Sequence, residues 1–84
     1  MTSTQITPDK VLDVRGMMCP MPVVKTGTAI KEIQIGQVLE VLATDPGSKP
    51  DLTAWAKMTG NELLQVEEME GSPKVYKFRF RRTK

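Results

Sequence analysis

The sequence contains no histidine and only one cysteine, Cys19. The lack of histidine excludes Cys–His dyads, Ser–His–Asp triads and imidazole metal sites. A single cysteine cannot form an internal disulfide, a four-cysteine zinc or iron–sulfur site, or a CxxC redox pair. A glycine-rich phosphate loop is missing too. We therefore expect no metal and no bound cofactor, which leaves the chemistry of one sulfur atom exchanging with another molecule.

Long apolar runs are also absent. No stretch approaches the ~20 apolar residues that cross a membrane, so we expect no membrane partner. Residues 1–9 have neither a charged leader nor an apolar signal core, and we interpret them as a flexible lead. The chain of 84 residues favours a single domain, which we place at residues 10–82. The single cysteine fits a reducing compartment, and we predict a cytoplasmic protein.

Acidic residues are absent after Glu70, where the chain is basic. Tyr76, Phe78 and Phe80 alternate with basic residues, so we expect the rings to face the core. One interpretation of the basic residues is a solvated strand face, which is slightly favoured. The other is a docking patch for an acidic protein or for RNA, formed by Lys77, Arg79 and Arg81. Without a further aromatic platform, we do not expect direct nucleic acid binding.

Hydrophobic periodicity and turn residues predict six elements. Strands are expected at residues 10–14, 37–44, 63–69 and 74–81. A first helix begins at Pro20 with Cys19 as its N-cap and runs to about Ile33. A second helix is capped by Ser48 and stopped by Gly60–Asn61.

The first three elements form a βαβ unit, so the first two strands should be parallel. The last two strands form an antiparallel hairpin, and the fourth strand is a candidate sheet edge. The predicted fold class is an α/β (α+β) two-layer sandwich, βαβαββ, with two helices on one face of a four-stranded mixed sheet. We expect a monomer.

Cys19 lies between a strand and a helix start, within Cys19-Pro20-Met21-Pro22. Lone cysteines in small domains are usually buried and inert, but this position and the two prolines, which restrict the backbone, favour a presented nucleophile. The thiolate is the reactive form. At a helix N-terminus, the Met21 and Val23 amides are the donors expected to stabilise it.

Residues before the cysteine have supporting roles in this interpretation. Gly16 permits the turn out of the first strand, and Arg15 is a cation available to help the sulfur anion. Met17 and Met18 surround the cysteine with soft apolar surface. At least one methionine is expected to fill the core, and the others to form a contact rim for partners.

The chain resembles the TusA family of sulfur carrier proteins, also called SirA-like. The resemblance rests on Leu12-Asp13-Val14-Arg15-Gly16 followed by Cys19-Pro20-Met21-Pro22, and continues through Gly36, Asp45-Pro46, Asp51, Trp55, Gly60 and the aromatic last strand. It implies a βαβαββ TusA-like domain in which Cys19 accepts sulfane sulfur as a persulfide. The implied donor is a cysteine desulfurase or a rhodanese-like protein, and the implied acceptor is a sulfurtransferase.

The resemblance implies pathways such as tRNA thiolation, molybdenum cofactor sulfuration or sulfur oxidation, without selecting one. Many relatives carry histidine where this chain has Asn61, which leaves the branch of the family open. The alternative is a small RNA- or protein-binding regulatory module in which Cys19 is structural or redox-sensing. A sulfur carrier acts within relays, so whether it counts as an enzyme is also open.

Overall fold

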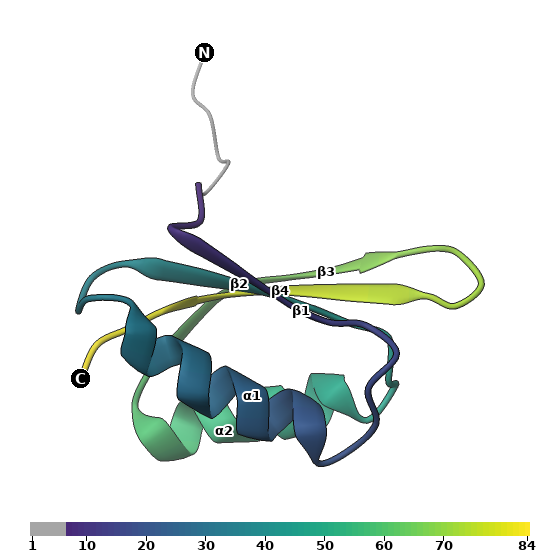
Figure 1. Ribbon diagram of the computed structural model, residues 1–84, viewed down its shortest axis with the longest axis horizontal. Helices are drawn as coiled ribbons and strands as arrows, with labels where there is room; N and C mark the ends of the chain where they lie inside the picture. The colour runs from purple at the N-terminus through teal and green to yellow at the C-terminus, as the bar shows by residue number, and fades with distance from the viewer. Residues whose placement is uncertain (1–6) are drawn as a thin grey trace.

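The computed structural model describes residues 7–84, and its elements follow the predicted order (Figure 1). They are β1 (Lys10–Val14), α1 (Met21–Ala29), the 3₁₀ turn η1 (Ile30–Glu32), β2 (Val38–Ala43), α2 (Ser48–Thr59), β3 (Glu62–Met69) and β4 (Val75–Arg81). The predicted βαβαββ fold is confirmed. Residues 1–6, which include most of the predicted N-terminal lead, lie outside the described residues.

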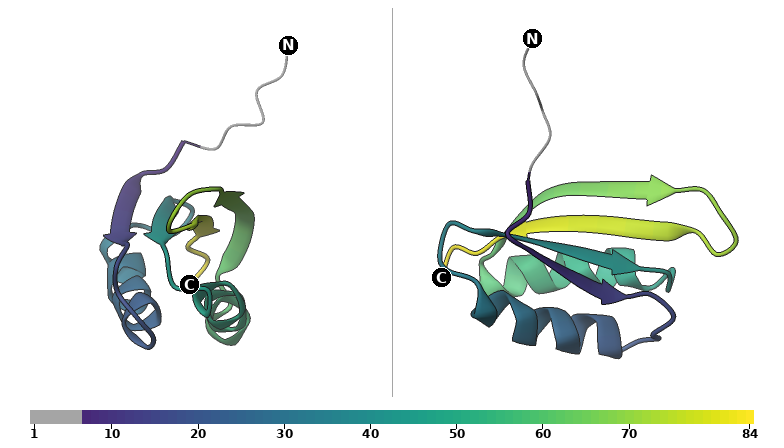
Figure 2. Two further views of the ribbon diagram at one scale, coloured as in Figure 1. Left: turned by 90° about the vertical axis from the view of Figure 1, so that its right-hand side faces the viewer. Right: turned by 45° about the horizontal axis from the view of Figure 1, so that its top comes forward.

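The four strands form one mixed sheet in the order β1-β2-β4-β3. β1 and β2 are parallel, as the βαβ unit requires, while β4 is antiparallel to both of its neighbours. Both helices cover the same face of the sheet (Figure 2). The candidate edge position of β4 is wrong, because β4 pairs with β2 as well as with its hairpin partner. The edges are β1 and β3.

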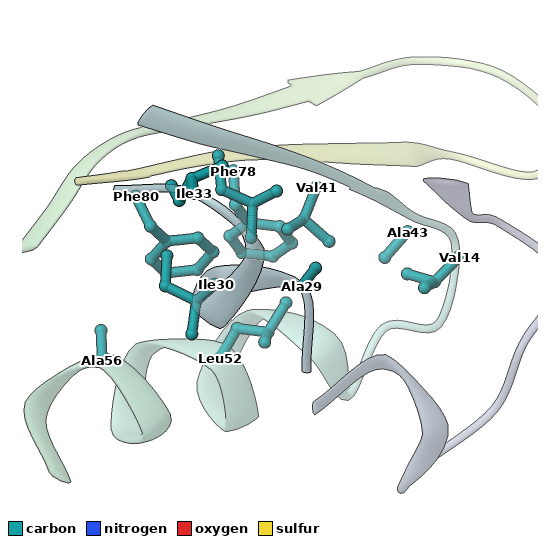
Figure 3. Packing of buried hydrophobic residues seen from close by; sticks show 11 residues of the cluster. Val14, Ala29, Ile30, Ile33, Val41, Ala43, Leu52, Ala56, Phe78 and Phe80 are labelled. Carbon is teal, nitrogen blue, oxygen red and sulfur yellow. The ribbon is translucent and has the colours of Figure 1, made fainter. Parts of the chain in front are cut away.

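The core lies between the sheet and the two helices (Figure 3). Alternate residues of β2 (Leu39, Val41 and Ala43) are fully buried on the helix-facing side. Phe78 and Phe80 pair with β2 and stack with ring centroids 6.0 Å apart. The rings of the last strand therefore face the core, as their alternation predicted.

Both helix starts differ by one residue from the prediction. Pro20, and not Cys19, is the N-cap of α1, and Gly47, and not Ser48, is the N-cap of α2. The Ser48 hydroxyl is buried and has no hydrogen-bond partner within residues 7–84. The end of α2 was predicted correctly, because Gly60 adopts the left-handed conformation (φ 79°) and its N–H donates to the Ala56 carbonyl.

Candidate functional site

The site lies at the edge of the sheet where the two parallel strands β1 and β2 end. The loops that follow these strands lie at the same end of the molecule (Figures 1 and 2). The carboxyl ends of adjacent parallel strands share one edge, so residues distant in sequence meet there. Gly16, with φ 83°, turns the chain out of β1, and its N–H donates to Thr44 Oγ1 at 2.9 Å. This bond ties the loop carrying the cysteine to the end of β2.

Cys19 is exposed at the start of α1 and contacts two carboxylates from the second loop and helix. Its backbone N–H donates to Asp45 Oδ2 at 2.9 Å, and its thiol donates to Asp51 Oδ2 at 3.5 Å. Asp45 Oδ1 also accepts the Gly47 N–H, at 3.1 Å. Asp45 therefore fixes the backbone of the cysteine to the start of α2, while Asp51 contacts the sulfur.

The surroundings of Cys19 raise its pKa. The largest cause is the hydrogen bond that the thiol donates to Asp51, followed by desolvation and by the negative charges of Asp51 and Asp45. The sequence predicted a thiolate stabilised at the helix N-terminus, and this expectation is wrong. These contacts favour the thiol over the thiolate.

The predicted amide donors are not directed at the sulfur. The Met21 N–H donates to the Met18 carbonyl at 2.9 Å, closing a turn before the helix. Within residues 7–84 no hydrogen bond joins Sγ to the amide of Met21 or of Val23, since the bond of Sγ goes to Asp51. The cause is local: Pro20 takes the N-cap position, so Cys19 lies one residue outside the helix.

The prolines and methionines around Cys19 divide into buried and exposed members. Pro22 is fully buried, and Thr26 Oγ1 donates to its carbonyl at 2.6 Å, which anchors the first turn of α1. Met17 is half-buried against the core. Met18 and Met21 are 75% and 39% exposed. One methionine thus packs against the core, and the other two are exposed on either side of Cys19 in the sequence. Their role as a contact rim stays a prediction.

Val23 and Arg15, the other predicted supporting residues, do not contact the sulfur. Val23 is half-buried against the core and anchors α1. Arg15 pairs with Asp13, with Nη2 to Oδ2 at 2.8 Å. This pairing lowers the pKa of the Asp13 carboxyl to about 2, chiefly through the side-chain hydrogen bond. The guanidinium is therefore engaged with its neighbour in β1.

The basic residues proposed for docking lie on β4, on the sheet face opposite the helices, and each one pairs with a carboxylate. Arg79 Nε is 3.0 Å from Glu40, and both side chains are largely buried. Arg81 pairs with Glu62 at 3.3 Å, while Lys77 and Glu67 are 3.8 Å apart. Each of these three basic side chains thus pairs with a carboxylate on a neighbouring strand. This pairing favours the interpretation as a solvated strand face over that as a basic docking patch. A docking role for these residues stays a prediction.

Asn61 lies just past the end of α2, whereas Cys19 precedes α1. Its amide group donates to Thr59 Oγ1 at 3.0 Å, and its Oδ1 accepts the Thr83 N–H at 3.1 Å. These bonds tie the helix end to the C-terminal residues. The Asn61 side chain therefore contacts the end of α2 and the C-terminal segment in this chain.

The contacts of Asp45 and Asp51 with Cys19 were not predicted, because the sequence analysis considered these two residues only as part of the family resemblance. A signal was present: Asp45 follows the second of two predicted parallel strands, whose carboxyl ends meet at one edge.

Within residues 7–84, no cluster of three metal-ligating side chains occurs. No helix in that part of the chain is long and apolar enough to cross a bilayer.

The chain is similar in sequence to a known protein family and to several individual proteins. The family described as Sulfurtransferase TusA matches residues 10–82. YrkI of Bacillus subtilis is 58% identical over 57 residues, which cover 68% of this chain and 76% of YrkI. The sulfur carrier protein TusA of Allochromatium vinosum is 46% identical over 63 residues, which cover 75% of this chain and 83% of that protein. In two further relatives the match makes up 34% and 31% of the relative's length.

A solved structure has the same fold. It is a SirA-like protein from Desulfitobacterium hafniense with a TM-score of 0.69 and 26% identity, and the match covers 89% of this chain and 99% of that one. The family match spans both strand-end loops and therefore includes Cys19, Asp45 and Asp51. The chain belongs to the TusA family.

Proposed function

We propose that this protein carries sulfane sulfur as a persulfide on Cys19. The proposal rests on one observation: the Cys19 thiol is exposed, and a hydrogen bond to Asp45 joins its loop to the loop after β2. The names of its relatives as sulfur carriers support the same role. Because Cys19 is exposed at the surface, the sulfur in this proposal is exchanged with a docked protein.

The exchange balances without an oxidant. The Cys19 sulfur, after losing its proton, attacks the terminal sulfur of a persulfide on the donor protein. A new S–S bond forms on Cys19, the S–S bond of the donor breaks, and the departing donor thiolate takes up the proton. In delivery, a thiol of an acceptor sulfurtransferase loses its proton and attacks the terminal sulfur of the Cys19 persulfide. The S–S bond on Cys19 then breaks, and Cys19 takes up the proton. The net change is the movement of one sulfur atom.

The donor in this proposal is a cysteine desulfurase or a rhodanese-like protein. The exposed rim of Met18 and Met21 gives it adaptable apolar surface beside the thiol. Candidate destinations are tRNA thiolation, cofactor sulfuration and sulfur oxidation. A reduced thiol is needed at rest, and we therefore place the activity in the cytoplasm.

Intact-mass spectrometry tests sulfur loading. The protein is incubated with a cysteine desulfurase and cysteine, and the mass is recorded before and after dithiothreitol treatment. We expect a gain of one sulfur atom, about 32 Da, that dithiothreitol removes. Cys19→Ser should show no gain. Because the chain has no other cysteine, a reducible gain that persists in this variant would refute the assignment.

A matched pair of variants tests the contact rim. Met18→Ala removes an exposed side chain next to Cys19, whereas Met58→Ala removes one that is 85% exposed on α2. We expect slower loading by the desulfurase only in Met18→Ala, with equal alkylation of the free thiol in both variants. Equal loading rates would exclude Met18 from the docking contact.

A further inference from the structure

We propose that Asp51 is a positioning residue that binds the sulfhydryl hydrogen of Cys19 and keeps the sulfur in its unreactive thiol form while the carrier is free. The inference deepens the proposed function and depends on it for its biological meaning. It concerns a carboxylate 32 positions away in sequence, from the first turn of the second helix.

The geometry separates the tasks of the two carboxylates. Both Asp45 oxygens are occupied by backbone N–H groups, those of Cys19 and Gly47. Asp51 is itself held in place by its backbone N–H, which donates to the Gly47 carbonyl at 3.2 Å, and its Oδ2 faces the sulfur. Asp45 thus sets where the cysteine backbone lies, and Asp51 sets where the thiol points.

The bond to Asp51 exists only in one protonation state of the sulfur. A carboxylate accepts a hydrogen bond from S–H, but it offers nothing to a thiolate and repels it. Ionisation of Cys19 therefore loses a hydrogen bond and places a new negative charge beside Asp51 and Asp45. The rise in the pKa of Cys19, chiefly through the Asp51 bond, agrees with this geometry.

No basic group of the surrounding segments offsets these charges. Arg15, in the same loop as Cys19, pairs with Asp13, and Lys49 of α2 pairs with Glu68. Lys25 of α1 makes no ion pair within residues 7–84 and is not among the groups that shift the Cys19 pKa. Neither Asp45 nor Asp51 forms an ion pair within this part of the chain. The site at the sulfur is locally negative although the chain carries a net charge of +2.

This arrangement protects an exposed thiol. Oxidation and alkylation proceed through the thiolate, so a carrier that holds its proton reacts slowly with small molecules. Sulfur loading then depends on the docked donor, which changes the surroundings of Asp51. Asp51 would thus limit sulfur uptake to the complex between the carrier and its sulfur donor.

The pH profile of thiol alkylation tests the proposal. Rates with iodoacetamide are measured from pH 6 to 11 for the wild type, Asp51→Asn and Asp51→Glu. Glu70→Gln is the matched control, because it removes one negative charge from an exposed residue in the β3–β4 turn. We expect the midpoint to fall only in Asp51→Asn, with a ~3- to 10-fold faster rate at pH 7, since one pKa unit corresponds to a tenfold change in thiolate. Asp51→Glu keeps the charge and should stay near the wild type.

An unchanged or higher midpoint in Asp51→Asn, with a native circular dichroism spectrum, would overturn the proposal. The wild type provides a second measurement that needs no variant: thiolate absorbance near 240 nm should give a midpoint above ~8.5, the value for free cysteine. A midpoint below that value would also overturn it. If Cys19 loads sulfur but the midpoint does not respond to Asp51, the positioning role fails and the proposed function stands. If Cys19 loads no sulfur, the proposed function fails.

Discussion

At the scale of single residues, the stability of this small domain depends on a few large side chains. Phe78 and Phe80 are fully buried in β4, and Trp55 of α2 packs edge-to-face on Phe80 with centroids 5.1 Å apart. An 84-residue chain has a small core and a total stability on the order of 5 kcal/mol. Each ring therefore accounts for a large share of the folding free energy.

Phe80→Ala tests the contribution of one of these rings to stability. Truncating a buried phenylalanine costs about 3–5 kcal/mol, which is comparable with the total stability. We expect a protein that is largely unfolded at 37 °C, as measured by circular dichroism during urea or thermal denaturation. Met58→Ala, at an exposed position, should change stability by less than ~0.5 kcal/mol. A cooperative wild-type transition in Phe80→Ala would show that the ring contributes little.

At the scale of elements, the helix ends decide where functional groups point. The one-residue shift of the α1 start takes Cys19 out of the N-cap position and places its thiol against Asp51. Proline patterns alone do not resolve a shift of one residue, because Pro20 is compatible with either the N-cap or the first turn. The electrostatics of the site follow from that small difference.

Two glycine substitutions form a matched pair that compares the backbone conformation at the end of a helix with that inside a helix. Gly60→Ala places a Cβ in the left-handed conformation that ends α2 (φ 79°), and should cost about 1–2 kcal/mol. Gly27→Ala lies inside α1, where the added Cβ would be 3.7 Å from Trp55 Nε1, an ordinary contact. It should stabilise by about 0.5–1 kcal/mol. Urea denaturation gives both values, and a loss of stability in Gly27→Ala would contradict the packing described here.

At the scale of the whole molecule, much of the architecture was predictable from sequence and the site only in part. The turn glycines and prolines and the alternation of the last strand indicated the element order, the mixed sheet and the position of Cys19. The carboxylates at the sulfur were not predicted, because Asp45 and Asp51 reach it only through the parallel arrangement of β1 and β2. The pairing of Arg79 with Glu40 was missed because it requires β4 to lie beside β2.

The pH dependence of unfolding is also a property of the whole molecule. The folded-state pKa values of Asp13, about 2, and of Glu68 are lowered, so their contributions are present above the unfolded values and are lost as the pH falls through the folded ones. The pKa values of Lys74 and Cys19 are raised, so their contributions are present below the unfolded values and are lost as the pH rises. Urea midpoints should be highest between about pH 5 and pH 8. Because these groups are exposed, high salt should weaken the pH dependence of the urea midpoint. The contribution of the hydrogen bond between Cys19 and Asp51 should be less sensitive to salt. A midpoint that still rises above pH 10 would contradict these assignments.

As a sulfur carrier, Cys19 must both accept sulfur and give it up. The most direct measurement loads the protein with isotopically labelled sulfur from a desulfurase, removes the donor, and adds an acceptor sulfurtransferase with a reduced active-site cysteine. We expect the labelled mass gain to disappear from this chain and to appear on the acceptor, and we expect Cys19→Ser to transfer none. Label that stays on the chain, or that reaches the acceptor equally through Cys19→Ser, would contradict this role of Cys19.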